Sequence, residues 1–256
     1  MQTLAMDARG AGAPLVAVHG WGFGRHVFDP VLDGLAARHR VVRVDLPGCG
    51  ESRPDRCGDD LDAIAASVLD AVPQPAWWLG WSLGGLVALA AARQRPQAVA
   101  GVTLVAASPC FPAFGDWPGI HAATLVDFAR AAERDPAGVH ARFLQLQLAG
   151  SARARPALRA LRAAAAIDGV PEGASLRAGL RILATTDLRG ALGALSCQVA
   201  AIMGEADPLV PVAVEPSLGA AGVLVERIAG AGHAPFASHP DAFLAAQAVL
   251  EQELMV

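Results

Sequence analysis

Short apolar runs alternate with amphipathic stretches over the first 106 residues. The runs at 14–18, 40–44 and 99–106, and a fourth that starts after Pro75, are typical of buried strands. Between them, residues 60–71 carry apolar side chains at a helical period, and residues 26–37 form a second amphipathic stretch. Strands that alternate with helices predict a parallel sheet with right-handed crossovers.

The alternation stops between residues 109 and 186, where no run is typical of a strand. Strand-like runs resume at 198–203 and 223–228, and an apolar helix ends the chain. We therefore expect an α/β fold with a mostly parallel, twisted sheet flanked by helices. Its core is predicted at residues 1–110 and 187–256, with a helical lid inserted at 111–186. Four lid helices are predicted, opening at Thr124 as a capping box and at Asp135-Pro136, and then spanning about 156–167 and 175–184.

The run after Pro75 ends in the G-x-S-x-G pattern Gly80-Trp81-Ser82-Leu83-Gly84, and a helix of small residues follows. Strand, sharp turn and helix form the context in which this pattern predicts a nucleophile elbow. The two glycines permit a turn at which a Cβ would collide with the neighbouring elements. Ser82 is therefore the candidate nucleophile. The alternative is a Gly-rich turn whose serine only caps the helix.

A serine hydroxyl needs an adjacent base, and the base needs an acid to orient it. His233 lies in a Gly-rich loop directly after the last predicted strand, and Asp207 follows the strand before it. The order Ser82, Asp207, His233 is the one found in α/β hydrolases. Glu205 is the rival acid, and a surface-loop histidine is the alternative for His233. Asp207 is favoured because it lies deeper in its loop.

The stretch His19-Gly20-Trp21-Gly22 follows the first predicted strand, at the edge of the sheet where ligands bind. We expect the backbone N–H groups of Trp21 and Leu83 to form an oxyanion hole. For the Trp21 indole two roles stay open: contact with the substrate, or simple packing in the loop. His19 and Asp45 are interpreted as structural, with Asp45 accepting hydrogen bonds from loop N–H groups.

Composition narrows the class of partner. The net charge of −4 argues against nucleic acid, although all 20 basic residues are arginine. The four cysteines (Cys49, Cys57, Cys110 and Cys197) include no C-x-x-C pair, so neither a disulfide framework nor a zinc site is expected. No apolar run approaches the roughly 20 residues of a membrane helix, and no signal peptide is evident. We expect a cytoplasmic monomer without metal or cofactor.

The chain resembles the α/β-hydrolase family of biotin-pathway carboxylesterases that demethylate pimeloyl-acyl-carrier-protein methyl ester. The matching stretches cover nearly the whole chain, and the Trp-rich elbow and lid segments are more specific than the generic hydrolase motifs. They are 19–22, 45–48, 78–87, 108–111, 117–120, 142–144, 146–147, 186–189, 233–236 and 239–240.

The resemblance implies contacts with substrate at Trp21, Leu83 and residues 143–147, namely Phe143, Leu144, Leu146 and Gln147. It also implies that the lid arginines Arg142, Arg155 and Arg159 receive an acidic acyl carrier protein. Arg155, Arg159 and Arg162 share one helical face, which suits an acidic partner and equally suits an ordinary solvated face. Pro156 disfavours helix at Arg155 and predicts a loop there. A basic residue that the family tends to carry near Gly138 is missing.

Two other functions compete with the carrier-linked methyl esterase. One is a general short-chain carboxylesterase without a carrier partner. The other is a non-enzymatic ligand receptor, against which the complete Ser82, Asp207 and His233 set argues. A dehalogenase is disfavoured because its elbow needs Asp where this chain has Ser82.

Overall fold

A computed structural model describes residues 4–52 and 58–254. Within these ranges, seven strands form one sheet in the order β1-β3-β2-β4-β5-β6-β7. β1 runs antiparallel to β3, and every other neighbouring pair is parallel. The strands are β1 Met6–Arg9, β2 Pro14–Val18, β3 Arg40–Val44, β4 Ala76–Trp81, β5 Val99–Val105, β6 Gln198–Gly204 and β7 Leu224–Ile228.

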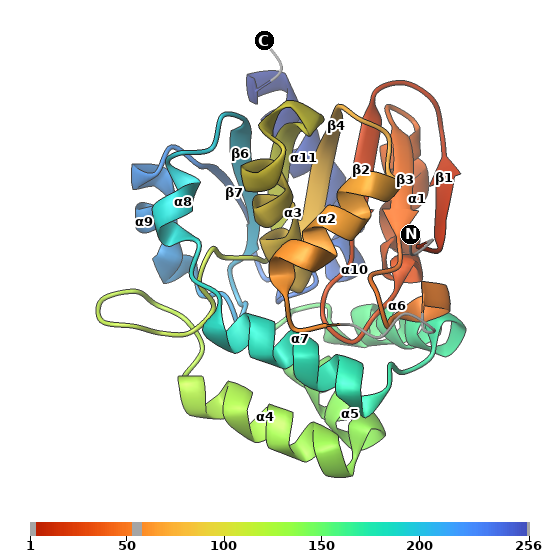
Figure 1. Ribbon diagram of the computed structural model, residues 1–256, viewed down its shortest axis with the longest axis vertical. Helices are drawn as coiled ribbons and strands as arrows, with labels where there is room; N and C mark the ends of the chain where they lie inside the picture. The colour runs from red at the N-terminus through yellow and green to blue at the C-terminus, as the bar shows by residue number, and fades with distance from the viewer. Residues whose placement is uncertain (1–3, 53–57, 255–256) are drawn as a thin grey trace.

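Helices cover both faces of the sheet, and the strands divide their side chains between two hydrophobic clusters. In β2, for example, Val16 and Val18 enter one cluster, whereas Leu15 and Ala17 enter the other, because successive side chains of a strand point to opposite faces. The first cluster packs under α2 and α3, and the second under α1 and α11 (Figure 1). These helices are α1 Asp29–Ala36, α2 Leu61–Ala71, α3 Leu83–Gln94 and α11 Pro240–Leu254.

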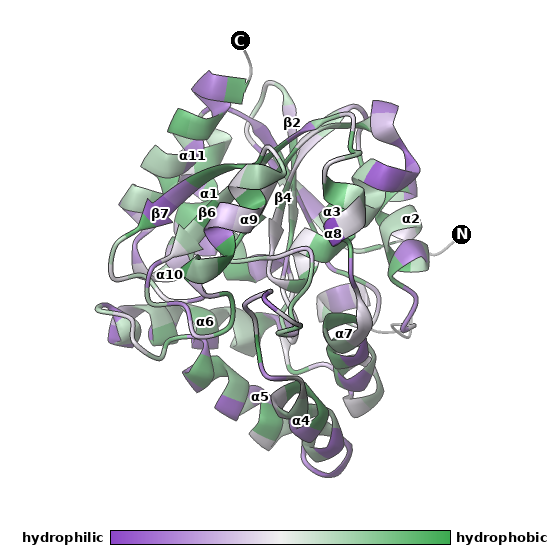
Figure 2. Cartoon of the chain, turned by 90° about the vertical axis from the view of Figure 1, so that its left-hand side faces the viewer, coloured by the Kyte–Doolittle hydropathy of each residue, from purple (hydrophilic) through white to green (hydrophobic). Residues whose placement is uncertain are grey.

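Four longer helices lie together beyond one end of the sheet (Figure 1). Hydrophobic and hydrophilic residues are mixed along these helices, as their colouring in Figure 2 shows. They are α4 Ala122–Arg134, α5 Pro136–Leu146, α6 Ala154–Asp168 and α7 Gly173–Thr185. Short helices complete the chain: α8 Arg189–Leu192, α9 Glu215–Ala220 and α10 Pro235–Ser238, with 3₁₀ turns η1 Arg25–Phe28, η2 Gly50–Ser52, η3 Pro96–Ala98 and η4 Val212–Val214.

The chain leaves the sheet for these helices and returns to it at one place. Cys110 and Asp187 form an isolated β-bridge, and the N–H of Leu188 donates to the carbonyl of Pro109 at 2.8 Å. We propose on this basis that residues 1–110 and 187–256 form the core and that residues 111–186 form the lid.

Three local predictions are wrong. Thr124 does not open α4, because the N-cap is His121, whose Nδ1 accepts from the N–H of Ala123. Arg155 lies inside α6, since a proline is tolerated in the first turn, where its missing N–H is not needed. The helix expected from His26 begins as the 3₁₀ turn η1, and α1 starts at Asp29.

Candidate active site

The predicted elbow is present where β4 passes into α3. Ser82 has φ 53° and ψ −119°, a strained conformation for a residue with a side chain. Ser82 is also buried, with only 2% of its surface exposed. A Cβ at Gly80 would lie 2.4 Å from the carbonyl oxygen of Gly84, and one at Gly84 would lie 2.2 Å from that of Val18. Both positions therefore require glycine, because the strand and the helix approach at backbone distance.

Three buried side chains from separate loops form one hydrogen-bonded chain. The Nε2 atom of His233 lies 2.8 Å from Ser82 Oγ, and its Nδ1 atom lies 2.8 Å from Asp207 Oδ2. Ser82 follows β4, Asp207 follows β6 and His233 follows β7, so parallel strands bring all three to the same edge of the sheet. The carboxylate is thus placed to hold the imidazole with Nε2 facing the hydroxyl.

Backbone groups fix the carboxylate of Asp207. Its Oδ1 atom accepts from the N–H of Leu209 at 2.8 Å and from that of Val210 at 3.0 Å. The rival acid Glu205 is exposed and only begins the same loop. The geometry therefore brings Asp207, and not Glu205, to His233.

The loop after β2 lies against the elbow. A Cβ at Gly20 would lie 3.1 Å from the Cβ of Ser82, so the backbone of this loop passes directly beside Ser82. Leu83 is the first residue of α3, where an N–H has no acceptor in the helix. Neither the N–H of Leu83 nor that of Trp21 has an acceptor among residues 4–52 and 58–254. Within these ranges both N–H groups are thus left without a protein acceptor, as the predicted oxyanion hole requires.

His19 ties this loop to the next one. Its Nδ1 atom lies 2.8 Å from the carbonyl oxygen of Gly20, and its Nε2 atom accepts from the N–H of Leu46 at 3.0 Å. Complete burial lowers the pKa of His19, against smaller opposing effects of the Asp45 charge and the Gly20 hydrogen bond. The neutral imidazole is therefore a structural link.

The depressed pKa of His19 predicts that the protein loses stability in mild acid. Below about pH 6.5 the imidazole binds a proton in the unfolded chain but stays neutral in the folded chain. The contribution of His19 to the free energy of unfolding is therefore complete above that pH and declines as the pH falls toward the folded pKa. Its slope reaches about 1.4 kcal/mol per pH unit. Urea unfolding of the wild type and of His19→Asn at pH 7.5 and 5.0 measures it. The variant is expected to lose less stability between the two pH values.

The exposed His121 provides the control, since His121→Asn is expected to keep the wild-type difference between the two pH values. A wild-type difference retained in His19→Asn would contradict the prediction.

Residues predicted to contact substrate divide between the two clusters. Trp21, Leu83 and Phe143 share the first, with Leu146 packed against it, and the rings of Trp21 and Phe143 meet edge to face at 4.6 Å. Leu144 lies in the second cluster.

Gln147 is buried, and its main-chain carbonyl oxygen accepts from the backbone N–H of His233 at 2.9 Å. The lid thus contacts the loop of the candidate base through its backbone. The oxyanion-hole and substrate roles given to all these residues stay predictions.

Two further residues, Trp81 and Leu176, connect to the site without having been predicted there. The indole N–H of Trp81 donates to the carbonyl of His233 at 2.7 Å, and that of Trp21 donates to the carbonyl of Leu176 on α7 at 2.7 Å. The acceptors are backbone oxygens, which carry no residue-specific signal. Only the position of Trp81 inside the elbow motif could have drawn attention to it.

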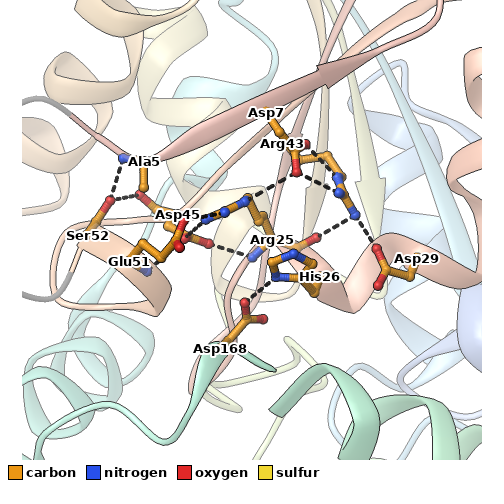
Figure 3. Close-up of polar contacts among 10 residues, drawn as sticks. All are labelled: Ala5, Asp7, Arg25, His26, Asp29, Arg43, Asp45, Glu51, Ser52 and Asp168. Carbon is orange, nitrogen blue, oxygen red and sulfur yellow. Dashed lines mark hydrogen bonds and ion pairs between the residues drawn. The ribbon is translucent and has the colours of Figure 1, made fainter. Parts of the chain in front are cut away.

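The predicted structural role of Asp45 is confirmed. Its buried carboxylate accepts from the N–H groups of Arg25 at 2.6 Å and Glu51 at 2.9 Å and pairs with the Arg25 guanidinium. Figure 3 shows this network reaching the lid, where Asp168 at the end of α6 lies 2.6 Å from Nδ1 of His26. Because Arg25 and His26 are neighbours in the chain, these contacts connect the loop after β3 to the end of α6.

The lid arginines predicted to bind a carrier are exposed. Arg142 lies on α5, with its guanidinium 6.0 Å from the ring centre of Phe128, and Arg155 and Arg159 lie on α6. None of the three has a carboxylate within 4.0 Å in the part of the chain that the structure describes. A surface hollow of 380 Å³, lined by residues 151–156, lies at the start of α6.

No group of three or more His, Cys, Asp or Glu side chains in residues 4–52 and 58–254 could hold a metal ion. Burial raises the pKa of the Cys110 and Cys197 thiols, and Cys57 lies outside the described residues. Within the same two ranges, every helix is too short or too polar to cross a membrane.

A mostly parallel sheet with a Ser–Asp–His set at the carboxyl ends of its strands defines the class of the α/β hydrolases. Sequence comparison agrees, since the alpha/beta hydrolase family matches residues 15–246. A pimeloyl-[acyl-carrier protein] methyl ester esterase from Methylococcus capsulatus is 42% identical over 238 residues, covering 92% of this chain and 93% of that protein. One with the same name from Sodalis glossinidius is 42% identical over 246 residues, covering 95% of each. The chain therefore belongs to the alpha/beta hydrolase family and, within it, to the family of these two esterases.

Solved structures agree on the fold. A hydrolase from Pseudomonas aeruginosa superposes with a TM-score of 0.81 at 25% identity, covering 96% of this chain and 93% of that one. A bromoperoxidase from Bacillus anthracis superposes with a TM-score of 0.86 at 21% identity, covering 97% and 95%, and this likeness concerns the fold alone.

Proposed function

We propose that this protein is a serine carboxylesterase that hydrolyses the methyl ester of pimeloyl-acyl-carrier protein during synthesis of the biotin precursor. The observation that carries the proposal is the buried chain from Ser82 through His233 to Asp207, found in a member of a family whose relatives bear this esterase name. The relatives' names supply the substrate, and the geometry supports the reaction type.

The proposed mechanism uses the side chains in sequence. Ser82 Oγ attacks the ester carbonyl carbon while His233 Nε2 takes the hydroxyl proton, and Asp207 stabilises the imidazolium. The N–H groups of Trp21 and Leu83 hold the oxyanion, each contributing on the order of 10²–10³ in rate. His233 gives the proton to the methoxy oxygen as its bond to the carbonyl carbon breaks, so methanol departs and an acyl-Ser82 ester remains. Water, deprotonated by His233, then releases the free carboxylate and restores Ser82.

The direct test compares hydrolysis of pimeloyl methyl ester on the carrier protein with hydrolysis of the same ester free in solution. A kcat/KM at least tenfold higher on the carrier-linked ester is expected. Equal values would favour the alternative, a general short-chain carboxylesterase. Rescue of a biotin-requiring strain that lacks this step tests the same proposal in cells.

The carrier is proposed to dock on the exposed arginines of α5 and α6. Unpaired cations on a chain of net charge −4 suit an acidic partner, because complementary charge raises the rate of encounter. Replacing Arg142, Arg155 and Arg159 with Ala is expected to lower kcat/KM on the carrier-linked ester about 10- to 100-fold, less at high salt, with the free ester unaffected. Steady-state kinetics at two ionic strengths measures both effects.

A charge-matched control removes three exposed arginines of the core, Arg9, Arg93 and Arg227, which pair with carboxylates of their own. This control is expected to stay within about threefold of wild type on the carrier-linked ester. Equal loss on both esters in the lid variant would instead indicate a damaged lid.

A further inference from the structure

Trp81 packs against two loops of the candidate site. It ends β4, directly before Ser82, and is fully buried. A Cβ at Gly20 would lie 2.9 Å from Cε3 of Trp81, so the indole lies against the loop of residues 19–22 that follows β2. Its ring also meets that of Phe236 edge to face at 5.1 Å, just beyond the loop of His233. One residue thus contacts both loops that accompany the nucleophile.

The backbone of His233 is held from two sides. Its carbonyl oxygen accepts from Nε1 of Trp81 at 2.7 Å, and its N–H donates to the carbonyl of Gln147 at 2.9 Å. The first partner belongs to the elbow and the second to the lid. The hydrogen bond from Trp81 therefore links the strand of the nucleophile to the loop of the base.

We infer that the indole N–H of Trp81 is a positioning group for the reaction. It sets the place of His233 relative to Ser82 and so maintains the 2.8 Å contact between Nε2 and Oγ. Without this donor the buried carbonyl of His233 loses a partner, and the loop relaxes away from the geometry of proton transfer. The inference rests on the proposed ester hydrolysis and concerns how its base is held.

The lid supplies the opposing restraint. Residues 147–152 pack against the loop that carries His233, where the N–H of Ala152 donates to the carbonyl of Gly230 at 2.9 Å. A Cβ at Gly232 would lie 2.9 Å from the carbonyl oxygen of Gln147, closer than real contacts allow. Gly232→Ala therefore disturbs the hydrogen bond on the other side of His233 without changing Trp81.

The test measures kcat and KM for p-nitrophenyl acetate, which needs no carrier. Trp81→Phe keeps an aromatic ring and removes the donor, and it is expected to lower kcat about 10- to 100-fold with KM within about twofold. Gly232→Ala is expected to show the same split. A fluorophosphonate that labels Ser82 should react more slowly with both variants by a similar factor.

Trp78 on the same strand is the matched control. It is fully buried, and its Nε1 atom has no partner among the described residues, so Trp78→Phe makes the same change without removing a hydrogen bond. Its kcat is expected within about twofold of wild type. Trp77→Phe adds a second control, because it removes a hydrogen bond to Thr103 (2.9 Å) that does not reach the base loop.

Replacement of residue 81 by 3-benzothienylalanine separates the donor from the ring shape, since sulfur takes the place of the N–H. A fall in kcat like that of Trp81→Phe supports the inference, and a wild-type kcat overturns it. A fall in Trp78→Phe equal to that in Trp81→Phe overturns it too. Failure of the carrier-linked substrate would contradict the proposed function alone, because the small ester still reports on the base.

Discussion

Ser82→Ala is expected to lower kcat for ester hydrolysis by roughly 10⁶-fold while leaving substrate binding intact. The variant loses the proposed nucleophile, the hydroxyl whose oxygen lies 2.8 Å from Nε2 of His233. The proposed oxyanion donors, the N–H groups of Trp21 and Leu83, remain in the variant, so the carrier-linked ester should still bind. Rate measurements on the carrier-linked ester, combined with calorimetric titration of the same variant, test both halves of the expectation.

Ser67 on α2 offers a control, since its hydroxyl only donates to the carbonyl of Ala63 in its own helix. Ser67→Ala should retain wild-type turnover and fluorophosphonate labelling. Substantial turnover by Ser82→Ala would remove Ser82 as the nucleophile. Failure of the wild type to label would favour the receptor alternative.

Asp207→Asn is expected to lower kcat by about 10⁴-fold. An amide in this position presents its NH₂ group to the imidazole or to the N–H groups of Leu209 and Val210, which now bind the carboxylate. The imidazole then loses the partner that fixes its tautomer and stabilises its cation. Because the substitution is nearly isosteric, KM should change little.

Glu205→Gln provides the comparison, since both residues lie in the loop after β6 and Glu205 is exposed. It should stay within about twofold of wild type. A reversed result, with Glu205→Gln inactive and Asp207→Asn active, would make Glu205 the acid.

Much of the fold follows from local apolar pattern, because strands buried on both faces appear as short apolar runs. Strand β1 departs from that rule. Its residues Met6–Arg9 include two charged side chains and are mostly exposed, so its place is determined by antiparallel pairing with β3 and not by burial. Cap chemistry predicted the start of α5 at Asp135, where the side chain accepts from the N–H of Gly138.

The candidate site was predictable where its chemistry resides in side chains. Ser82, Asp207 and His233 each follow a predicted strand, so parallel topology brings them to one edge. The main-chain groups that hold the site's loops in place could not be predicted in the same way. The carbonyls of Gln147 and Leu176 act through the backbone, which every residue possesses, and only the folded lid brings them to His233 and Trp21.

The two ends of the lid, residues 111–186, lie side by side, which affects how another segment could replace it. With Pro109 and Leu188 hydrogen-bonded at 2.8 Å, a transplanted segment of another length can start and finish at fixed points without stretching the sheet. Such a graft would nevertheless have to present two main-chain oxygens, one where Gln147 meets His233 and one where Leu176 meets Trp21. A chimera that closes the gap but omits them should fold and yet work poorly.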